Sequence, residues 1–280
     1  MIRRRRVYLE PRTEPAPDEA VELEREGCAV IRGLFTPAEV TELAEAVTAV
    51  FETEPPDARG NREADDAAMF RYAMLNRCAA AQTAIAHPRL LSVIEPLLGE
   101  DCHVIANTAW WQQPGDNDHL GRFWHIDAGP HVPRDPAVPW DSRIPYPVFA
   151  VAAHLYLQDC PVGAGPTGVI PGSHTSGQRP PMDRAADDGL EWEGRGSRTI
   201  TAAAGDVALF VSDIWHRRMP PGPGDTGRMF VQCHYGRRDL AQRIRPTSAV
   251  NHLSDDAVAR ARTPRERTLA GLHPLGFYDG

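Results

Sequence analysis

Apolar residues in the N-terminal third of the chain recur with the period of an α-helix. A helix is expected from Pro37 to about Phe51, with Thr36 as its N-cap. Glu39 stands three residues after Thr36 and completes a capping box, in which each side chain binds the backbone amide of the other residue. One face of this helix is apolar and predicts burial. That face is formed by Val40, Leu43, Val47, Val50 and Phe51.

After Asp101 the pattern changes to the two-residue alternation that is typical of strands. Long loops rich in proline and glycine separate these segments. Helices followed by many strands favour an α+β fold with a mainly β core, either an antiparallel barrel or a double-sheet jelly roll, with helices packed outside. Function on such a scaffold is expected near strand ends, at the mouth of the barrel. Strands are expected over 28–32, 102–113, 147–157, 199–201, 207–211 and 229–235, further helices over 18–27, 87–98 and 254–261, and loops over 128–146 and 160–172.

The length of 280 residues suits one large domain or two small ones. No repeat and no clear linker interrupts the chain, so we expect a single domain over 18–280, preceded by a disordered or loosely packed tail over 1–17. The tail contains four arginines at positions 3–6, but the apolar segment of a signal peptide does not follow them. No apolar run approaches the roughly 20 residues of a membrane helix. We therefore expect no association with a membrane.

Composition removes several classes of chemistry. All 30 basic residues are arginine, which excludes a Schiff-base lysine, a lysine general base and a phosphate-binding P-loop. The net charge of −8 argues against a nucleic-acid partner. Five widely spaced cysteines without a Cys-x-x-Cys pair argue against disulfides and against a cysteine zinc site. They indicate small buried hydrophobic side chains in a reducing compartment, and we expect a cytoplasmic location.

A histidine and an aspartate stand two residues apart in the extended segment Phe123-Trp-His-Ile-Asp127. Side chains at positions i and i+2 of a strand point to the same face, so His125 and Asp127 can bind one metal ion. His216, just after another expected strand, can supply a third ligand. Two histidines and one carboxylate leave metal positions open for substrates. A lone His-x-Asp also occurs as an ordinary surface pair, and the spacing by itself leaves both interpretations open.

Arg228 opens the next expected strand, twelve residues after His216. We expect this strand to pair antiparallel beside the segment of His216, which would direct Arg228 into the same cavity. A guanidinium there can bind a carboxylate through two parallel hydrogen bonds, as the far end of a dicarboxylic keto acid requires. Arg217 and Arg218 are expected in a Pro/Gly-rich loop, where they are alternative anchors or substrate contacts.

The order of these motifs resembles the phytanoyl-CoA dioxygenase-like family, whose members are Fe(II)- and 2-oxoglutarate-dependent oxygenases on a double-stranded β-helix. The resemblance covers roughly residues 28–238 and lies in the combined order rather than in any one motif. The matching segments are His125-Ile-Asp127, Leu157-Gln-Asp159, Gly165-Pro-Thr-Gly-Val-Ile-Pro-Gly-Ser-His174, Gly205-Asp206-Val-Ala-Leu-Phe210, and His216 with Arg228.

The resemblance implies a 2-oxoglutarate-dependent dioxygenase that uses Fe(II), 2-oxoglutarate and O2. It implies His125, Asp127 and His216 as iron ligands, and Arg228 as the residue that binds the distal carboxylate of 2-oxoglutarate. The expected reaction hydroxylates an unactivated C–H bond of a small biosynthetic metabolite and releases succinate and CO2. Desaturation, epimerisation or ring closure by the same triad, a metal hydrolase or isomerase without cosubstrate, and a degenerate binding protein are the alternatives. Because Asp127 is intact, halogenation is not expected.

Five more side chains are candidates for the site. Thr108 and Gln112 share one face of the strand before His-x-Asp, where the family often places polar residues that hold the cosubstrate. His154 and Tyr156 share the parity expected to face the cavity, and Trp124 fits either a substrate wall or the core. The expected partner is a small molecule, and the expected state is a monomer or homodimer. Structural roles, in packing, on the surface or in turns, are expected for His119, His131, His174, His234, Asp159 and Asp206.

Overall fold

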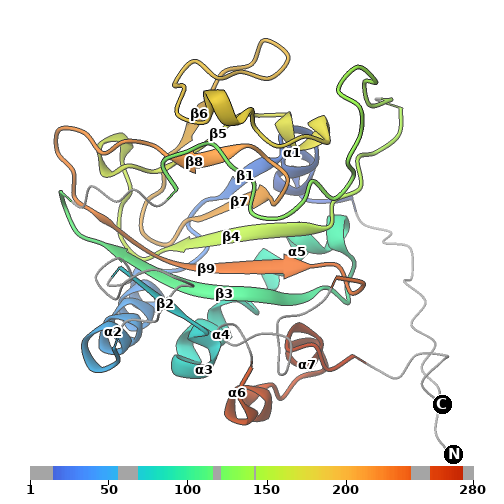
Figure 1. Ribbon diagram of the computed structural model, residues 1–280. Coiled ribbons are helices and arrows are strands. Elements are labelled where there is room, and N and C mark those ends of the chain that lie inside the picture. The colour runs from blue at the N-terminus through green and yellow to red at the C-terminus, as the bar shows by residue number, and fades with distance from the viewer. Residues whose placement is uncertain (1–14, 56–68, 116–120, 142, 241–252, 274–280) are drawn as a thin grey trace, which may run out of the picture.

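Two antiparallel sheets form the core of the structure, a computed structural model that describes residues 15–55, 69–115, 121–141, 143–240 and 253–273. The larger sheet has the strand order β1-β7-β4-β9-β3-β2, and the smaller sheet has the order β6-β5-β8. The two sheets lie one above the other in Figure 1. The strands are β1 (Cys28–Ile31), β2 (Phe70–Tyr72), β3 (His103–Gln112), β4 (Ala150–Tyr156), β5 (Thr167–Val169), β6 (Arg198–Ile200), β7 (Val207–Val211), β8 (His216–Arg218) and β9 (Arg228–Gly236).

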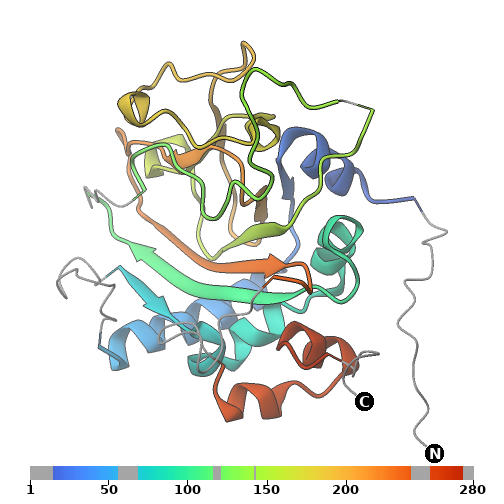
Figure 2. The same cartoon turned by 45° about the vertical axis from the view of Figure 1, so that its right-hand side comes forward.

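Most of the helices cover the face of the larger sheet that points away from the smaller sheet, as both cartoon views show (Figure 1, Figure 2). The chain is therefore an α+β protein with antiparallel sheets. Within the described ranges, three short 3-10 helices occur in the loops of the opposite half. The α-helices are α1 (Asp18–Glu26), α2 (Pro37–Thr53), α3 (Met74–Arg77), α4 (Ala79–Ala84), α5 (Pro88–Leu98), α6 (Asp255–Arg260) and α7 (Pro264–Leu269), and the 3-10 helices are Val162–Ala164, Ser173–Ser176 and Met182–Arg184.

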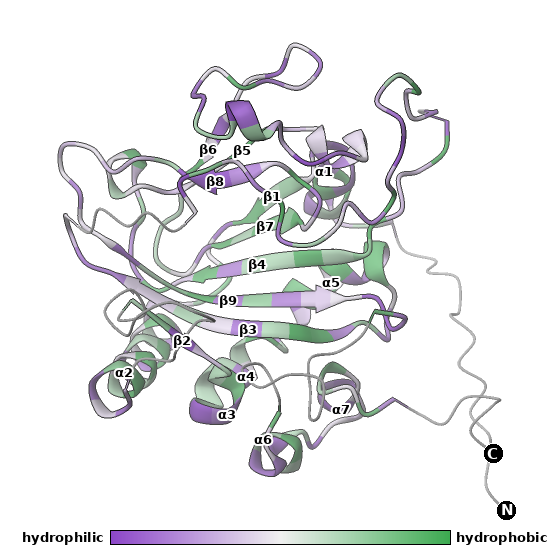
Figure 3. Ribbon diagram, viewed as in Figure 1, coloured by the Kyte–Doolittle hydropathy of each residue, from purple (hydrophilic) through white to green (hydrophobic). Residues whose placement is uncertain are grey.

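The two-residue alternation along the strands separates an outer face from an inner face. On β9, Val231, Cys233 and Tyr235 pack with the helices in the main apolar core. Phe230, one position away, belongs to a second apolar cluster that also contains residues of the smaller sheet. Hydropathy follows the same division: β7 is almost wholly apolar, β8 is hydrophilic, and polar segments interrupt β3, β4 and β9 (Figure 3). Polar side chains such as those of His154 and Arg228 thus face the space between the sheets, whereas Asn107 and Arg71 contact Leu75 and Phe51 on the helical side.

The long elements agree with the sequence pattern. The predicted strands appear with shifts of at most three residues at their ends, and the capping box of Thr36 and Glu39 at the start of α2 is confirmed. The short elements β2, β5, β8, α3, α4 and α7 were not predicted. Three residues carry little alternation, so β2, β5 and β8, which are defined by backbone pairing with distant strands, were missed, whereas β6, also of three residues, was predicted.

Three predictions about the region of His216 are wrong. Arg217 and Arg218 lie in strand β8 rather than in a loop, and the predicted loop 160–172 contains β5, the partner of β8. The strand of Arg228, β9, pairs with β3 and β4 in the larger sheet and not beside β8. Arg228 therefore approaches from the sheet opposite to the one that carries His216.

Several predictions about the rest of the chain have simple outcomes. The predicted tail lies mostly outside the described residues, which begin at position 15. All five cysteines are buried and free. Among the described helices, none combines the length and the apolar character needed to cross a bilayer.

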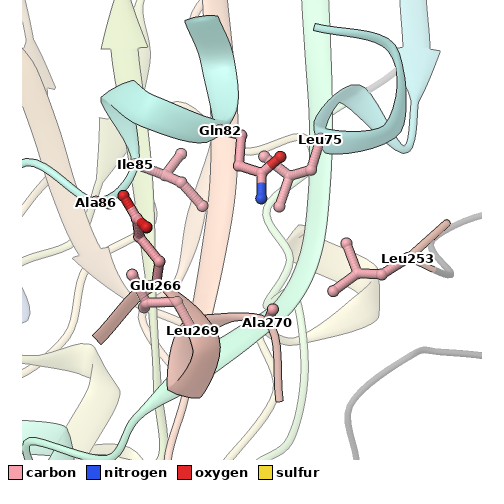
Figure 4. A pocket seen from close by; sticks show the side chains of 8 residues that line it. All are labelled: Leu75, Gln82, Ile85, Ala86, Leu253, Glu266, Leu269 and Ala270. Carbon is pink, nitrogen blue, oxygen red and sulfur yellow. The ribbon is translucent and has the colours of Figure 1, made fainter. Parts of the chain in front are cut away.

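A cavity of about 10 Å³ lies between α4 and α7, and it has room for at most one water molecule (Figure 4).

Asp206, in the turn between β6 and β7, holds this turn against the residues that follow β1. The Asp206 carboxylate accepts backbone hydrogen bonds from Gly33 (2.7 Å) and Ala203 (2.9 Å), and pairs with Arg32 (2.6 Å). Burial of Asp206 would raise its pKa, but these donors outweigh burial and hold the pKa below its ordinary value. The turn role predicted for Asp206 is thereby confirmed.

We expect Asp206→Asn to lower the free energy of unfolding by about 1–3 kcal/mol at neutral pH, since the amide cannot accept all three hydrogen bonds. A native pKa below the unfolded value makes this contribution complete above about pH 4 and lost as the pH falls through the native pKa. Urea unfolding of both proteins at pH 7 and pH 3 measures the difference. Asp183→Asn, at an exposed position, is the control with no expected change. A difference between wild type and Asp206→Asn that stayed constant with pH would contradict the ionic role.

Candidate metal centre

His125, Asp127 and His216 come together in the space between the sheets. One ligand atom of each lies within 4.8 Å of the others. A backbone bridge holds the two histidines in register: the His125 amide donates to the His216 carbonyl (2.9 Å), and the His216 amide donates to the His125 carbonyl (3.0 Å). The Asp127 amide donates to the Ser212 carbonyl (3.2 Å). Backbone pairing, which sequence spacing does not reveal, thus brings the third ligand to the His-x-Asp pair.

Both imidazoles have a defined orientation. Nδ1 of His125 lies 2.7 Å from the Phe123 carbonyl oxygen, and Nδ1 of His216 lies 2.9 Å from that of Ile214. A carbonyl only accepts, so Nδ1 must carry the proton, and the lone pair of each neutral ring is on Nε2. The Nε2 atoms lie 4.0 Å (His125) and 3.4 Å (His216) from Oδ1 of Asp127. The three donor atoms therefore face one point, as metal coordination requires.

The electrostatics of the cluster favour a cation. Burial of Asp127 would raise its pKa, but the imidazoles of His216, His234 and His125 outweigh burial and hold the pKa below its ordinary value. Burial would likewise lower the pKa of His216, but the Asp127 carboxylate raises it. Asp127 is thus an anion that attracts a positive charge at His216, and a metal ion can take the place of that proton.

Exposure differs across the three ligands. The His125 side chain is 41% exposed, whereas that of His216 is 7% exposed. Asp127 lies between these values, at 22%. The centre therefore opens to solvent on the side of His125 and is closed on the side of His216.

Arg228 and Gln112 form the polar end of the interior. They are register partners on β9 and β3, and Nε of the buried Arg228 donates to Oε1 of Gln112. The guanidinium carbon of Arg228 lies 5.2 Å from the centre of the Phe230 ring. Thr108 is four residues before Gln112, on the same face of β3, and pairs with Gln232. The contact between Gln112 and Arg228 agrees with a shared role in holding a ligand, and the cosubstrate role of Thr108 stays a prediction.

His154 and Tyr156 lie on the inner face of β4, as the alternation predicts. Both are buried, and His154 stacks on Phe230 with 4.4 Å between ring centres. Burial and the nearby Arg228 hold the pKa of His154 well below its ordinary value, so the ring is neutral. Burial also raises the pKa of Tyr156, which keeps its phenol protonated. Their assignment as substrate residues stays a prediction.

Trp124 and Arg217 lie apart from this interior. Trp124 is buried in a separate cluster with Ile126 and Trp215, and donates from Nε1 to the Asp187 carbonyl (2.7 Å). The Arg217 guanidinium stacks over the Trp124 ring at 4.6 Å and pairs with Asp188. Both residues are next to a metal-facing histidine in extended backbone, which directs them to the opposite side of β8 and of the segment of His125.

His234 is a residue of the site that the sequence analysis assigned to the surface or to packing. Its Nδ1 lies 3.9 Å from Oδ2 of Asp127. The available signal was the parity of β9, because His234 is six residues after Arg228 and so lies on the same face. By contrast, His174 has the structural role predicted for it, since Nε2 lies 3.0 Å from the Glu24 carbonyl oxygen.

Comparison with known proteins agrees with this geometry. The sequence profile described as phytanoyl-CoA dioxygenase (PhyH) matches residues 23–218, well over half of the chain. The chain belongs to the phytanoyl-CoA dioxygenase family. The matched range of this PhyH domain includes all three candidate ligands and ends at Arg218, ten residues before Arg228. Among curated proteins, no match to the chain was found.

Solved structures with the fold of this PhyH chain include two enzymes of nogalamycin biosynthesis. The epimerase SnoN, in complex with Fe3+, alpha ketoglutarate and a nogalamycin compound, has a TM-score of 0.62 and 18% identity, covering 86% of this chain and 96% of its own. The carbocyclase SnoK from nogalamycin biosynthesis has a TM-score of 0.59 and 18% identity, covering 86% and 94%. HygX from Streptomyces hygroscopicus, with nickel and 2-oxoglutarate bound, has a TM-score of 0.58 and 15% identity, covering 86% and 97%. Because all three identities are below 20%, these similarities show a shared fold and nothing more.

We expect His216→Ala to weaken the binding of Co(II) by more than the roughly 100-fold that loss of an outer partner costs, because a direct ligand is removed. Titration followed by the visible absorption of Co(II) measures this. His234→Gln is the matched control, and we expect it to keep a site with the same spectrum. Equal loss of binding in both variants would show that His234 is itself a ligand.

Proposed function

We propose that this PhyH-family chain is an Fe(II)- and 2-oxoglutarate-dependent oxygenase, and that its two sheets form a double-stranded β-helix. Iron would be held by His125, Asp127 and His216, and the distal carboxylate of 2-oxoglutarate by Arg228. One observation carries the proposal. A cluster of two imidazoles and one carboxylate shares its interior with a buried arginine that comes from the opposite sheet.

The donor set fits ferrous iron. Two neutral imidazoles with Nε2 directed at a carboxylate supply three ligands on one side, the facial arrangement typical of non-heme iron oxygenases. Such a centre keeps positions for a chelating keto acid and for O2. When bound, iron would activate O2 with electrons from 2-oxoglutarate, which leaves as succinate and CO2.

The residues of the chain bind, orient and shield the reactants. Gln112 holds Nε of Arg228 and thereby sets the plane of the guanidinium, which can bind a carboxylate through two parallel hydrogen bonds. Phe210 and Phe230 are buried and line the interior between Arg228 and His216. They exclude water, which strengthens the electrostatic contacts of an anionic cosubstrate. The primary substrate would reach the metal centre from the more exposed side, that of His125.

We propose hydroxylation of an unactivated C–H bond of a small biosynthetic metabolite as the reaction. Epimerisation or ring closure is the second candidate, because the neighbours SnoN and SnoK are described as an epimerase and a carbocyclase. A small-molecule substrate is supported by the nogalamycin compound bound to SnoN. We further propose a single domain over 18–280, a monomer or homodimer, and a cytoplasmic location, the last from the five free buried cysteines.

We expect anaerobic addition of Fe(II) and 2-oxoglutarate to give a visible charge-transfer band, and O2 then to produce succinate. Arg228→Ala should weaken 2-oxoglutarate binding by about 10- to 100-fold, since a charge-assisted hydrogen-bonded pair is lost. Arg228→Lys is the matched control, and it should recover only part of the affinity because an ammonium lacks the planar fork.

The absence of both the band and succinate in the wild-type protein would exclude the oxygenase. An Arg228→Ala variant that turned over a substrate at the wild-type rate without 2-oxoglutarate would instead favour a metal hydrolase or isomerase.

The oxidative outcome is decided by isotope labelling. A screen of metabolites read by succinate release identifies a substrate, and the reaction is then run under labelled O2. Hydroxylation places one labelled oxygen atom in the product. Succinate formation with an unlabelled product of unchanged mass would indicate epimerisation, and an unlabelled product two hydrogens lighter would indicate ring closure or desaturation.

A further inference from the structure

His154 is a buried polar side chain without a hydrogen-bond partner among the described residues. It lies on β4 with 6% of its surface exposed, and neither Nδ1 nor Nε2 has a partner there. Nearly all buried polar side chains are hydrogen-bonded, because an unsatisfied group keeps its full desolvation penalty. A neutral imidazole offers one donor and one acceptor. The position therefore calls for a ligand.

Two phenylalanines define where His154 lies. The Phe210 ring is 4.9 Å from the His154 ring and 4.8 Å from the ring of the metal-site residue His216. The Phe230 ring is 4.4 Å from the His154 ring and 5.2 Å from the guanidinium carbon of Arg228. His154 is thus placed between the metal centre and Arg228.

The register of the larger sheet gives the same order. On β9, the inner positions run from Arg228 through Phe230 and Gln232 to His234, which lies near Asp127. His154 is the register partner of Gln232, in the middle of this run. Its partner on the other side, on β7, is Ala208, which has a small side chain.

Resting on the function proposed above, we propose that His154 binds the cosubstrate: its ring N–H donates a hydrogen bond to a carboxylate oxygen of the 2-oxo acid that extends from Arg228 to the metal. Such a ligand has acceptor oxygens at both ends and would occupy the space between the metal centre and Arg228, next to His154. A primary substrate is the less suitable partner, because it must enter from the exposed side of His125. A purely packing role is also less suitable, because phenylalanine would fill an aromatic environment without an unsatisfied polar group.

The test compares His154→Phe with His154→Asn. Ligand-free melting temperature and the dissociation constant of 2-oxoglutarate, measured by calorimetry with the Ni(II)-loaded protein, are the two readouts. We expect His154→Phe to melt about 2–4 °C higher, because the unsatisfied group is gone, and to bind 2-oxoglutarate about 10-fold more weakly. His154→Asn keeps a donor and should recover part of the affinity without the gain in melting temperature.

His103→Phe is the matched control. His103 is also buried, but its ring nitrogens have partners, His273 (2.9 Å) and the Leu240 carbonyl (3.0 Å). We expect a lower melting temperature and unchanged 2-oxoglutarate binding. The assignment is overturned if His154→Phe binds 2-oxoglutarate like wild type, if it binds more tightly than His154→Asn, or if His103→Phe weakens binding equally. If the wild-type protein does not bind 2-oxoglutarate, the proposed function itself is wrong. Arg228→Ala distinguishes a wrong role for His154 from a wrong function, because this variant must weaken 2-oxoglutarate binding whatever the role of His154.

Discussion

The alternation of side chains along β3, β4 and β9 is the constraint on which the rest of the structure depends. Each strand presents one row of side chains to the helices and the other row to the space between the sheets. On β9 the outer row is apolar, with Val231, Cys233 and Tyr235 in the main core. A register shift of one residue would place Arg228 among those apolar side chains. The register that buries the core is therefore the register that aims the arginine.

The metal centre depends on a second constraint, the backbone bridge between His125 and His216. Two hydrogen bonds hold these residues opposite each other, so the imidazoles are placed by main-chain geometry rather than by flexible side chains. Their Nδ1 contacts with local carbonyls then orient the rings. Such orientation before any ligand binds lowers the entropic cost of assembling the site. Because the chain has no lysine, any contact to a ligand carboxylate by a permanently charged side chain must come from arginine.

The interior combines aromatic walls with a few polar groups. Phe210 contacts His216 and His154, and Phe230 contacts His154 and Arg228. An apolar lining strengthens electrostatic contacts, but it also penalises any polar group that is left without a partner. Places where a folded chain departs from local rules are often functional sites. The neutral, buried imidazole of His154 is such a departure in the middle of an otherwise well-packed strand.

The sequence by itself determined the elements and residues whose signals are local. The capping box at Thr36, the long strands, the His-x-Asp pair and the inward parity of His154 follow from spacing within one segment. Only the tertiary structure decided that β9 joins β3 and β4, that β8 is a strand, that Arg217 stacks on Trp124 and that His234 approaches Asp127. The physical reason is that these features arise from backbone pairing between distant segments. Alternation states which residues share a face, but only the pairing of strands decides what that face meets.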